Sequence, residues 1–80
     1  MLHTILRLPE VLKRRGRSRS SHYKDIQDGL FPPPIKIGLR AAGWIEQETD
    51  TINAARIAGK TDNEIRALVV KLEAARKTVI

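Results

Sequence analysis

Three consecutive prolines near the middle of the chain, Pro32 to Pro34, constrain its fold more than any other feature. Proline has no backbone N–H to donate and its ring fixes φ, so a helix cannot run through these residues. The 80-residue sequence must therefore divide into a segment before the prolines and a segment after them. A chain of this length has room for one small hydrophobic core.

The segment before the prolines predicts a short first helix. Leu8, Val11 and Leu12 have the i, i+3, i+4 spacing of one apolar helix face. Pro9 suits the first turn of this helix, where its missing N–H would have no partner in any case. Gly16 can end the helix because glycine takes a left-handed conformation without steric cost.

A second helix is predicted from about Arg19 to Asp28. Ser18 can cap its start by accepting a backbone N–H two or three residues further on, and Gly29 can end it. Two helices joined by a short, glycine-containing turn form a helix-turn-helix.

The residues after the prolines predict a β-hairpin. Residues 35–37 alternate between apolar and polar side chains as a strand does, residues 38–40 can turn, and residues 41–45 can return as a second strand. Residues 3–7, which are partly β-branched, can form another short strand. A hairpin of this size after a helix-turn-helix is a wing.

Two further helices are predicted after the hairpin. Acidic residues in the first turn and a stop at Gly59 predict a helix over Glu46–Ala58. Thr61 and Glu64 have the spacing of a capping box, which opens a last helix from about Asp62 to Thr78.

The expected fold class is therefore mainly α with a small β-hairpin wing: a winged helix-turn-helix domain over residues 1–58, followed by a C-terminal helix within residues 59–80. Apolar residues of the last helix repeat as a and d positions of a heptad. They are Ile65, Leu68, Leu72, Ala75 and Val79. The register lasts little more than two heptads, so this helix can pack on its own domain or pair with a second copy as a homodimer.

Positive charge is concentrated at the start of the chain. Residues 1–24 hold seven basic residues and one acidic residue, and this excess equals the net charge of the whole chain, +6. So concentrated a positive field points to a polyanionic partner, with nucleic acid ahead of an acidic membrane surface. A basic face that serves only solubility is the competing explanation.

Other classes of protein are disfavoured by what the sequence lacks. It has no cysteine, its two histidines have no second ligand at metal-binding spacing, and it has no glycine-rich phosphate loop. We therefore expect no cofactor, no metal and no enzymatic activity. No apolar run approaches the length of a membrane span and no signal-peptide pattern occurs, so a cytoplasmic, nucleoid-associated protein is expected.

Five short motifs follow one another at close spacing. They are Leu8-Pro9-Glu10-Val11-Leu12, Ser18-Arg19-Ser20-Ser21-x-Tyr23-Lys24, Gly29-x-Phe31-Pro32-x-Pro34, Lys36-Ile37-Gly38 and Arg40-Ala41-Ala42-Gly43-Trp44. Together they resemble the AlpA family of phage and prophage regulatory proteins, which are related to excisionase-like and MerR-like winged helix-turn-helix domains. The resemblance covers roughly residues 4 to 58.

This resemblance implies a DNA-binding transcriptional regulator carried on integrated phage or on genomic islands. Some members of the family act on an integrase gene, and others are accessory factors that bend DNA for excision. The position before Tyr23 is usually aliphatic in the family and is His22 here. We expect His22 to be a partly buried, hydrogen-bonded core residue, with a role towards DNA as the alternative.

A DNA-binding role assigns candidate residues to three places. Arg14, Arg15 and Arg17, at the end of the first helix and in the turn, would flank the groove and neutralise phosphates. The second helix of a helix-turn-helix enters the major groove, and one stripe of this helix, over residues 19–28, would meet DNA. Arg19 or Lys24 could bond guanine and Gln27 adenine, while the serines and tyrosine would hold phosphates. The wing, residues 35–45, would lie on the backbone or in the minor groove. The full set is Arg14, Arg15, Arg17, Arg19, Ser20, Tyr23, Lys24, Gln27, Lys36 and Arg40.

Several alternatives remain open from the sequence. Each candidate can also be part of an ordinary solvated face, and Phe31 and Trp44 are expected in the core rather than on a stacking surface. Scarce aromatics disfavour an RNA-binding protein. Two competing functions remain. One is an excisionase-like factor that acts with an integrase, and the other is a protein-interaction module that uses the last helix at Leu68 and Leu72.

Overall fold

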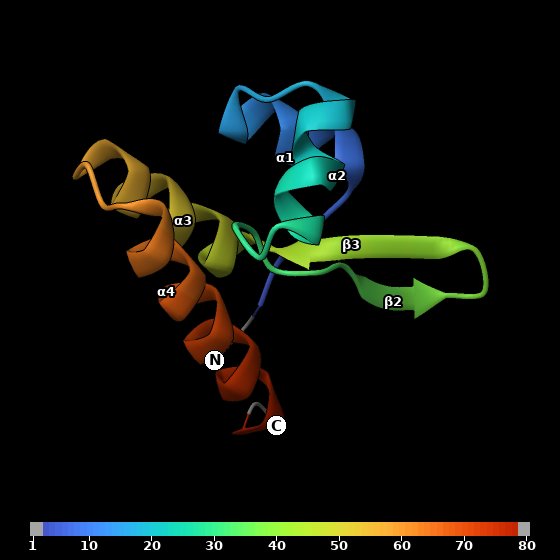
Figure 1. The fold of residues 1–80 in the computed structure, drawn as a ribbon. Coiled ribbons are helices and arrows are strands. Elements are labelled where there is room, and N and C mark those ends of the chain that lie inside the picture. The colour runs from blue at the N-terminus through green and yellow to red at the C-terminus, as the bar shows by residue number, and fades with distance from the viewer. Residues whose placement is uncertain (1–2, 79–80) are drawn as a thin grey trace.

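The computed structural model describes residues 3–78, and this part of the chain contains four α-helices and a three-stranded sheet (Figure 1). In chain order the elements are β1 (Ile5–Leu6), α1 (Leu8–Arg15), α2 (Arg19–Gln27), β2 (Ile35–Gly38), β3 (Ala41–Ile45), α3 (Glu46–Ile57), α4 (Asp62–Ala75) and a 3₁₀ turn (Arg76–Thr78). The expected mainly α fold with a small hairpin wing is confirmed. Val79, expected on the stripe of the last helix, lies outside the described residues.

Local signals in the sequence fix the ends of the helices. Gly16 ends α1 with φ 65° and ψ 34°, the left-handed conformation that glycine adopts most easily. The Ser18 hydroxyl accepts the backbone N–H of Ser21 at 3.2 Å and so caps α2. Thr61 and Glu64 form both bonds of a capping box at the start of α4. These caps explain why the predicted and observed helices begin and end within a few residues of each other.

The sheet joins the N-terminal strand to the hairpin. Its strand order is β1-β3-β2, with both pairs antiparallel. β1 is shorter than the expected strand over residues 3–7. A side chain at Gly43 would overlap Ile5 and would stand 2.9 Å from the carbonyl oxygen of Leu6. Only glycine therefore lets β1 approach β3 this closely.

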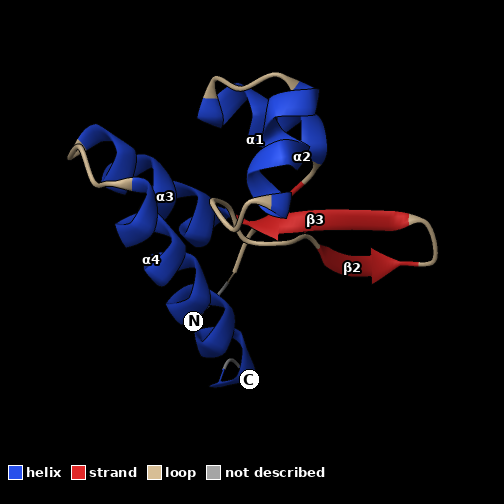
Figure 2. Cartoon of the chain, in the orientation of Figure 1, coloured by secondary structure: helices blue, strands red, loops and turns tan. Residues whose placement is uncertain are grey.

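The helices and the wing have different surroundings. Figure 1 shows α1 and α2 against one side of β3, with α3 and α4 beside the base of the sheet. Figure 2 shows β2 and β3 running on past the helices as a two-stranded hairpin that ends in a loop. The outer part of the wing therefore projects beyond the helices.

One hydrophobic core joins the four helices to β1 and β3. Its buried members are Leu6, Val11, Leu30, Phe31, Trp44, Ile52, Ala55, Ile65 and Val69. Phe31 and Trp44 are 1% and 2% exposed, so the prediction that both aromatic residues lie in the core is confirmed. Every helix except α2 supplies a buried apolar residue, and α2 contributes the partly buried Ile26.

The last helix packs on the domain with a stripe that differs slightly from the expected one. Ile65 is buried and Leu68 and Leu72 pack against the core, but Ala75 is exposed and Val69 is buried in its place. The inward stripe follows the 3.6-residue period of a single helix against a globular core, rather than a heptad seam. None of the helices in the described residues is long and apolar enough to cross a membrane.

Candidate nucleic-acid interface

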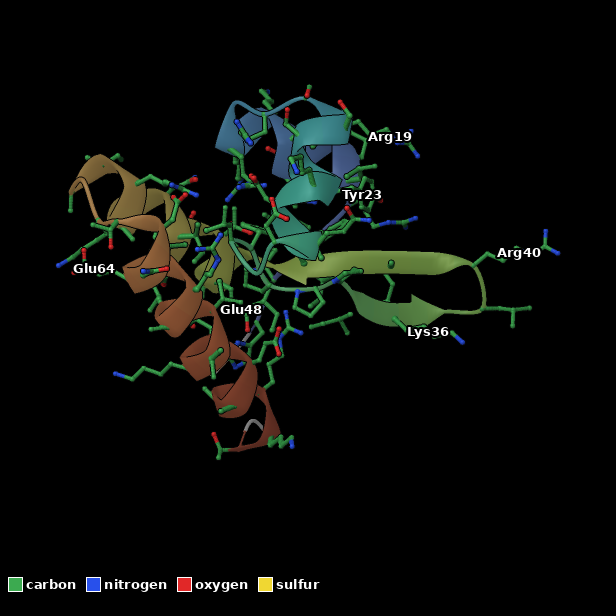
Figure 3. All side chains as sticks on the ribbon, viewed as in Figure 1. Arg19, Tyr23, Lys36, Arg40, Glu48 and Glu64 are labelled. Carbon is green, nitrogen blue, oxygen red and sulfur yellow. The ribbon has the colours of Figure 1, made fainter. Side chains whose placement is uncertain are left out.

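The outer face of α2 carries the stripe of polar residues that the sequence predicted. Every member of this stripe is exposed in the structure: Arg19, Ser20, Tyr23, Lys24 and Gln27. The side chain of Lys24 is 75% exposed and Tyr23 is 40% exposed. In Figure 3 the side chains of Arg19 and Tyr23 leave α2 on the side of the wing, away from α3 and α4. These residues can all meet a ligand without any rearrangement of the core.

The inner face of α2 is held by ionic contacts rather than by apolar packing alone. Asp25 is 6% exposed and accepts hydrogen bonds from two arginines. Arg15 Nη2 donates to its Oδ2 at 2.8 Å, and Arg17 donates to Oδ2 from Nε at 3.1 Å and to Oδ1 from Nη2 at 3.0 Å. His22 completes this group of four, which we call the Asp25 clamp. It ties the end of α1 and the turn to α2.

Arg15 is the buried arginine of the clamp. Its side chain is 3% exposed, and its guanidinium carbon lies 4.0 Å from the centre of the Phe31 ring. Burial lowers the pKa of Arg15, and its bonds to Asp25 oppose that effect. Burial likewise disfavours the charge of Asp25, but the hydrogen bonds from Arg15 and Arg17 outweigh it and hold the pKa of Asp25 below its ordinary value. Both groups are therefore charged at neutral pH.

His22 is hydrogen-bonded and lies in the interior, so its prediction as a core residue is confirmed, although at 0% exposed its burial is complete rather than partial. Arg15 Nη1 lies 2.8 Å from His22 Nδ1. Because a guanidinium can only donate, Nδ1 must accept and the ring is neutral with its proton on Nε2. Burial first, and then the charge of Arg15, lowers the pKa of His22 from 6.5 to about 4. The rings of Trp44 and Phe31 lie 4.8 and 5.2 Å from it, centre to centre.

Arg14 joins α1 to α3 instead of standing free. Its Nη1 lies 2.6 Å from Glu46 Oε2 and its Nε 3.2 Å from Glu10 Oε2. Its backbone oxygen accepts a bond from Asn53 Nδ2 at 3.1 Å. The side chain is 36% exposed. These contacts fix the end of α1 against the third helix.

The arginines expected to flank the DNA thus have unequal access to it. Arg15 is buried in the clamp, so a phosphate has no access to its guanidinium, and we leave it out of the interface. Arg14 and Arg17 keep about two fifths of their side chains exposed, but both are already paired with acidic groups. All three line an open groove of about 620 Å³ that also contains Asn53 and Arg56 of α3. They face α3 more than the outer side of α2.

Acidic residues were the part of the site that the sequence reasoning missed. Neither Asp25 nor Glu48 was among the candidate residues from the sequence, yet both are buried, at 6% and 7% exposed. Asp25 follows His22 by three residues and precedes Ile26, which places it on the inward face of α2. That spacing was a signal in the sequence. The partner of Glu48 is Arg76, which also bonds the carbonyl oxygen of Pro33 at 2.9 Å.

The wing carries the remaining candidates, Lys36 and Arg40. Both are exposed, and neither forms an ion pair with another residue that the structure describes. Figure 3 shows Arg40 at the outer end of the hairpin and Lys36 on β2. Within residues 3–78 no group of histidine and acidic residues is arranged to hold a metal ion.

The sequence of this chain matches the model of a known protein family. The family model described as prophage CP4-57 regulatory protein (AlpA) matches residues 4–56. The matched part runs from the N-terminal strand almost to the end of α3 and leaves α4 outside. It therefore covers the helix-turn-helix, the clamp and the wing.

Two curated proteins are similar to this chain. An uncharacterized protein, ORF88, of Enterobacteria phage P4 is 42% identical over 55 residues, which is 69% of this chain and 62% of that protein. The DNA-binding transcriptional activator AlpA of Escherichia coli (strain K12) is 36% identical over 52 residues, which is 58% of this chain and 74% of that protein. The match thus spans less than two thirds of the phage protein. No solved structure matches the chain.

The Asp25 clamp generates a prediction about stability. Asp25→Asn keeps the shape of the side chain but leaves two guanidiniums without their shared charge. We expect the free energy of unfolding, measured by urea titration, to fall by about 3 kcal/mol. Asp50→Asn, at an exposed position of α3, is the control and should change it by less than about 0.5 kcal/mol. Equal stabilities for the two variants would contradict the assignment.

His22 generates a prediction about pH. Its pKa is about 4 in the folded protein and 6.5 ordinarily, so between these values the unfolded chain binds a proton that the folded protein does not. The contribution of His22 to the free energy of unfolding is therefore fully present above pH 6.5. It is lost as the pH drops to 4, by about 3 kcal/mol in all. Asp25, whose pKa is lowered, loses its contribution in the same direction.

Urea midpoints measured from pH 7.5 to pH 4.5 check this. The variant His22→Leu should show a much flatter dependence than the parent protein over this range. If the two proteins lost stability in parallel, the titration would have to come from another group.

Proposed function

This chain belongs to the AlpA family of prophage regulatory proteins, and we propose that it is a DNA-binding transcriptional regulator that reads duplex DNA with the outer face of α2. The name of the E. coli relative, DNA-binding transcriptional activator AlpA, supports this proposal. The observation that carries it is the two-sided character of α2. Its inner face is fixed by the Asp25 clamp, while its outer face is an exposed polar stripe in which only the ring of Tyr23 touches buried residues, His22 and Trp44.

The start of α2 provides the leading edge of the proposed interface. Arg19 and Ser20 occupy its first turn, which contains no acidic residue. Backbone N–H groups and the positive end of the helix dipole favour a phosphate near such a start. Arg19 extends from this edge and can form two hydrogen bonds to the O6 and N7 atoms of a guanine.

Further along the helix the stripe offers different contacts. Lys24 can bond guanine and Gln27 can pair with the N6 and N7 atoms of adenine. Tyr23 carries its hydroxyl on the same face and can bond a phosphate, which sets the register without reading sequence. A rigid α2 makes these contacts selective, because the clamp leaves the helix one orientation relative to α1.

The wing supplies a second, smaller part of the interface. Lys36 and Arg40 are exposed cations on a hairpin that projects from the body (Figure 3). They would contact the backbone or the minor groove next to the major groove that α2 occupies. Neutralised phosphates release counterions, so binding should weaken as salt rises.

Single exposed cations test the proposal. Arg19→Ala and Lys24→Ala should each weaken binding to a duplex, selected by the parent protein from a random pool, by about tenfold to a hundredfold. Lys71→Ala removes the same charge from an exposed position of α4 and is the control. Salt screens a charge that lies far from the interface, so this variant should change the dissociation constant by less than about twofold. Fluorescence anisotropy at physiological salt measures all three.

Unfolding midpoints of the variants must match that of the parent protein, since none of these side chains supports the core. If Arg19→Ala and Lys24→Ala bound the selected duplex as tightly as Lys71→Ala, α2 would not be the reading element. Footprinting on the genome that carries the gene then distinguishes two roles of the same DNA-binding surface. Protection over a promoter supports regulation of transcription, and protection over an integration site supports an accessory role in excision.

A further inference from the structure

The wing ends in a leucine that the fold does not use. Leu39 is 89% exposed, and with Arg40 it forms the turn between β2 and β3. We propose that Leu39 is an apolar wedge that inserts between base pairs from the minor groove and kinks the duplex. This inference rests on the proposed function, because it requires that α2 hold the neighbouring major groove.

The turn itself gives no reason for a leucine. Turn positions favour glycine, asparagine, aspartate and serine, which suit the backbone and stay solvated. Among residues 3–78 no residue other than glycine has a positive φ, so the turn accepts any of these polar residues without strain. An apolar side chain that is almost fully exposed at such a position departs from the local rule. Departures of this kind are expected where function, rather than folding, selects the residue.

The charge around Leu39 fits DNA. From Gly29 to Ile45 the chain contains two basic residues, Lys36 and Arg40, and no acidic residue. Ile37, on the strand leading to the turn, is 43% exposed and adds apolar surface close to the tip. An apolar tip with cationic neighbours is the combination that minor-groove wedges use, because the cations hold the flanking phosphates while the wedge unstacks a base step.

Other exposed apolar side chains lack these surroundings. Ile57 is 88% exposed, but it lies on the groove lined by Arg14, Arg15, Arg17 and Arg56, whose positive charges are already paired with acidic side chains. Val70 is 68% exposed on α4, in a part of the chain where basic and acidic residues balance. Leu39 is therefore singled out by its place on a wing without acidic residues.

The reach of the wing is adequate. Strands rise about 3.4 Å per residue, so the five residues of β3 span roughly 17 Å. One turn of DNA measures about 34 Å, so a minor groove lies roughly half of that, about 17 Å, from the adjacent major groove. Figure 1 shows the hairpin extending past α2 without a covering element. The strand is thus about as long as the distance between the two grooves.

The experiment uses a duplex that the parent protein selects from a random pool, with a donor and an acceptor dye at its ends. 2-Aminopurine, which brightens when it is unstacked, is placed in turn at each step of the flank beside the α2 footprint. Leu39→Asn gives the turn a residue it favours, so this variant should fold. Leu39→Met keeps an apolar side chain of similar length. Ile57→Asn removes an equally exposed apolar side chain from the end of α3 and is the matched control.

We expect the parent protein to shorten the end-to-end distance, as a kink of about 20 to 90° requires, and to brighten 2-aminopurine at one flanking step. Leu39→Met and Ile57→Asn should do the same. Leu39→Asn should keep the footprint of α2 but lose both the kink and the brightening. These results would support the wedge.

Two results would overturn it, and they can be told apart. If Leu39→Asn kinked and unstacked the duplex as the parent protein does, the wedge alone would be wrong and the proposed function would stand. If the parent protein selected no duplex from the pool, the proposed function and the wedge would fail together.

Discussion

The buried carboxylate of Asp25 is the contact on which the rest of the proposed binding surface depends. It belongs to α2, and it accepts hydrogen bonds from Arg15 at the end of α1 and from Arg17 in the turn. Forming a buried ion pair adds little net stability, because each charge loses its hydration, but removing one partner leaves an uncompensated charge and is costly. We infer that the clamp acts mainly by selecting one angle between the two helices. That angle determines which side chains of α2 face outward.

The clamp also changes how the charge of the chain should be understood. The sequence places an excess of +6 within residues 1–24, which invites the picture of a uniformly basic surface. In the structure Arg15 and Arg17 form ion pairs with Asp25, and Arg14 forms ion pairs with Glu10 and Glu46. Part of the positive charge therefore maintains the fold, and a smaller number of cations on α2 and the wing remains for the recognition that we propose. A surface of this kind depends more on the position of each cation than on net charge.

Much of the fold could be predicted because its signals are local. Gly16, Ser18 and the Thr61–Glu64 capping box each determine a helix end within a few residues, and so does Gly29 after α2, where φ is 76°. The exposed stripe of α2 followed from helical spacing alone. The contacts that could not be predicted join residues distant in sequence: Arg76 with Glu48, or β1 with β3 across Gly43. The burial of Asp25 lies between these cases, since its spacing from His22 was visible but its partners on another helix were not.

The central claim is that the outer face of α2 lies in the major groove, held there at an angle that the clamp determines. Methylation interference on a duplex selected by the parent protein tests this claim most directly, because methyl groups on guanine N7 project into the major groove and those on adenine N3 into the minor groove. The account predicts that methylation of guanine N7 blocks binding within one continuous major-groove segment. Binding that tolerates N7 methylation throughout the site would contradict it.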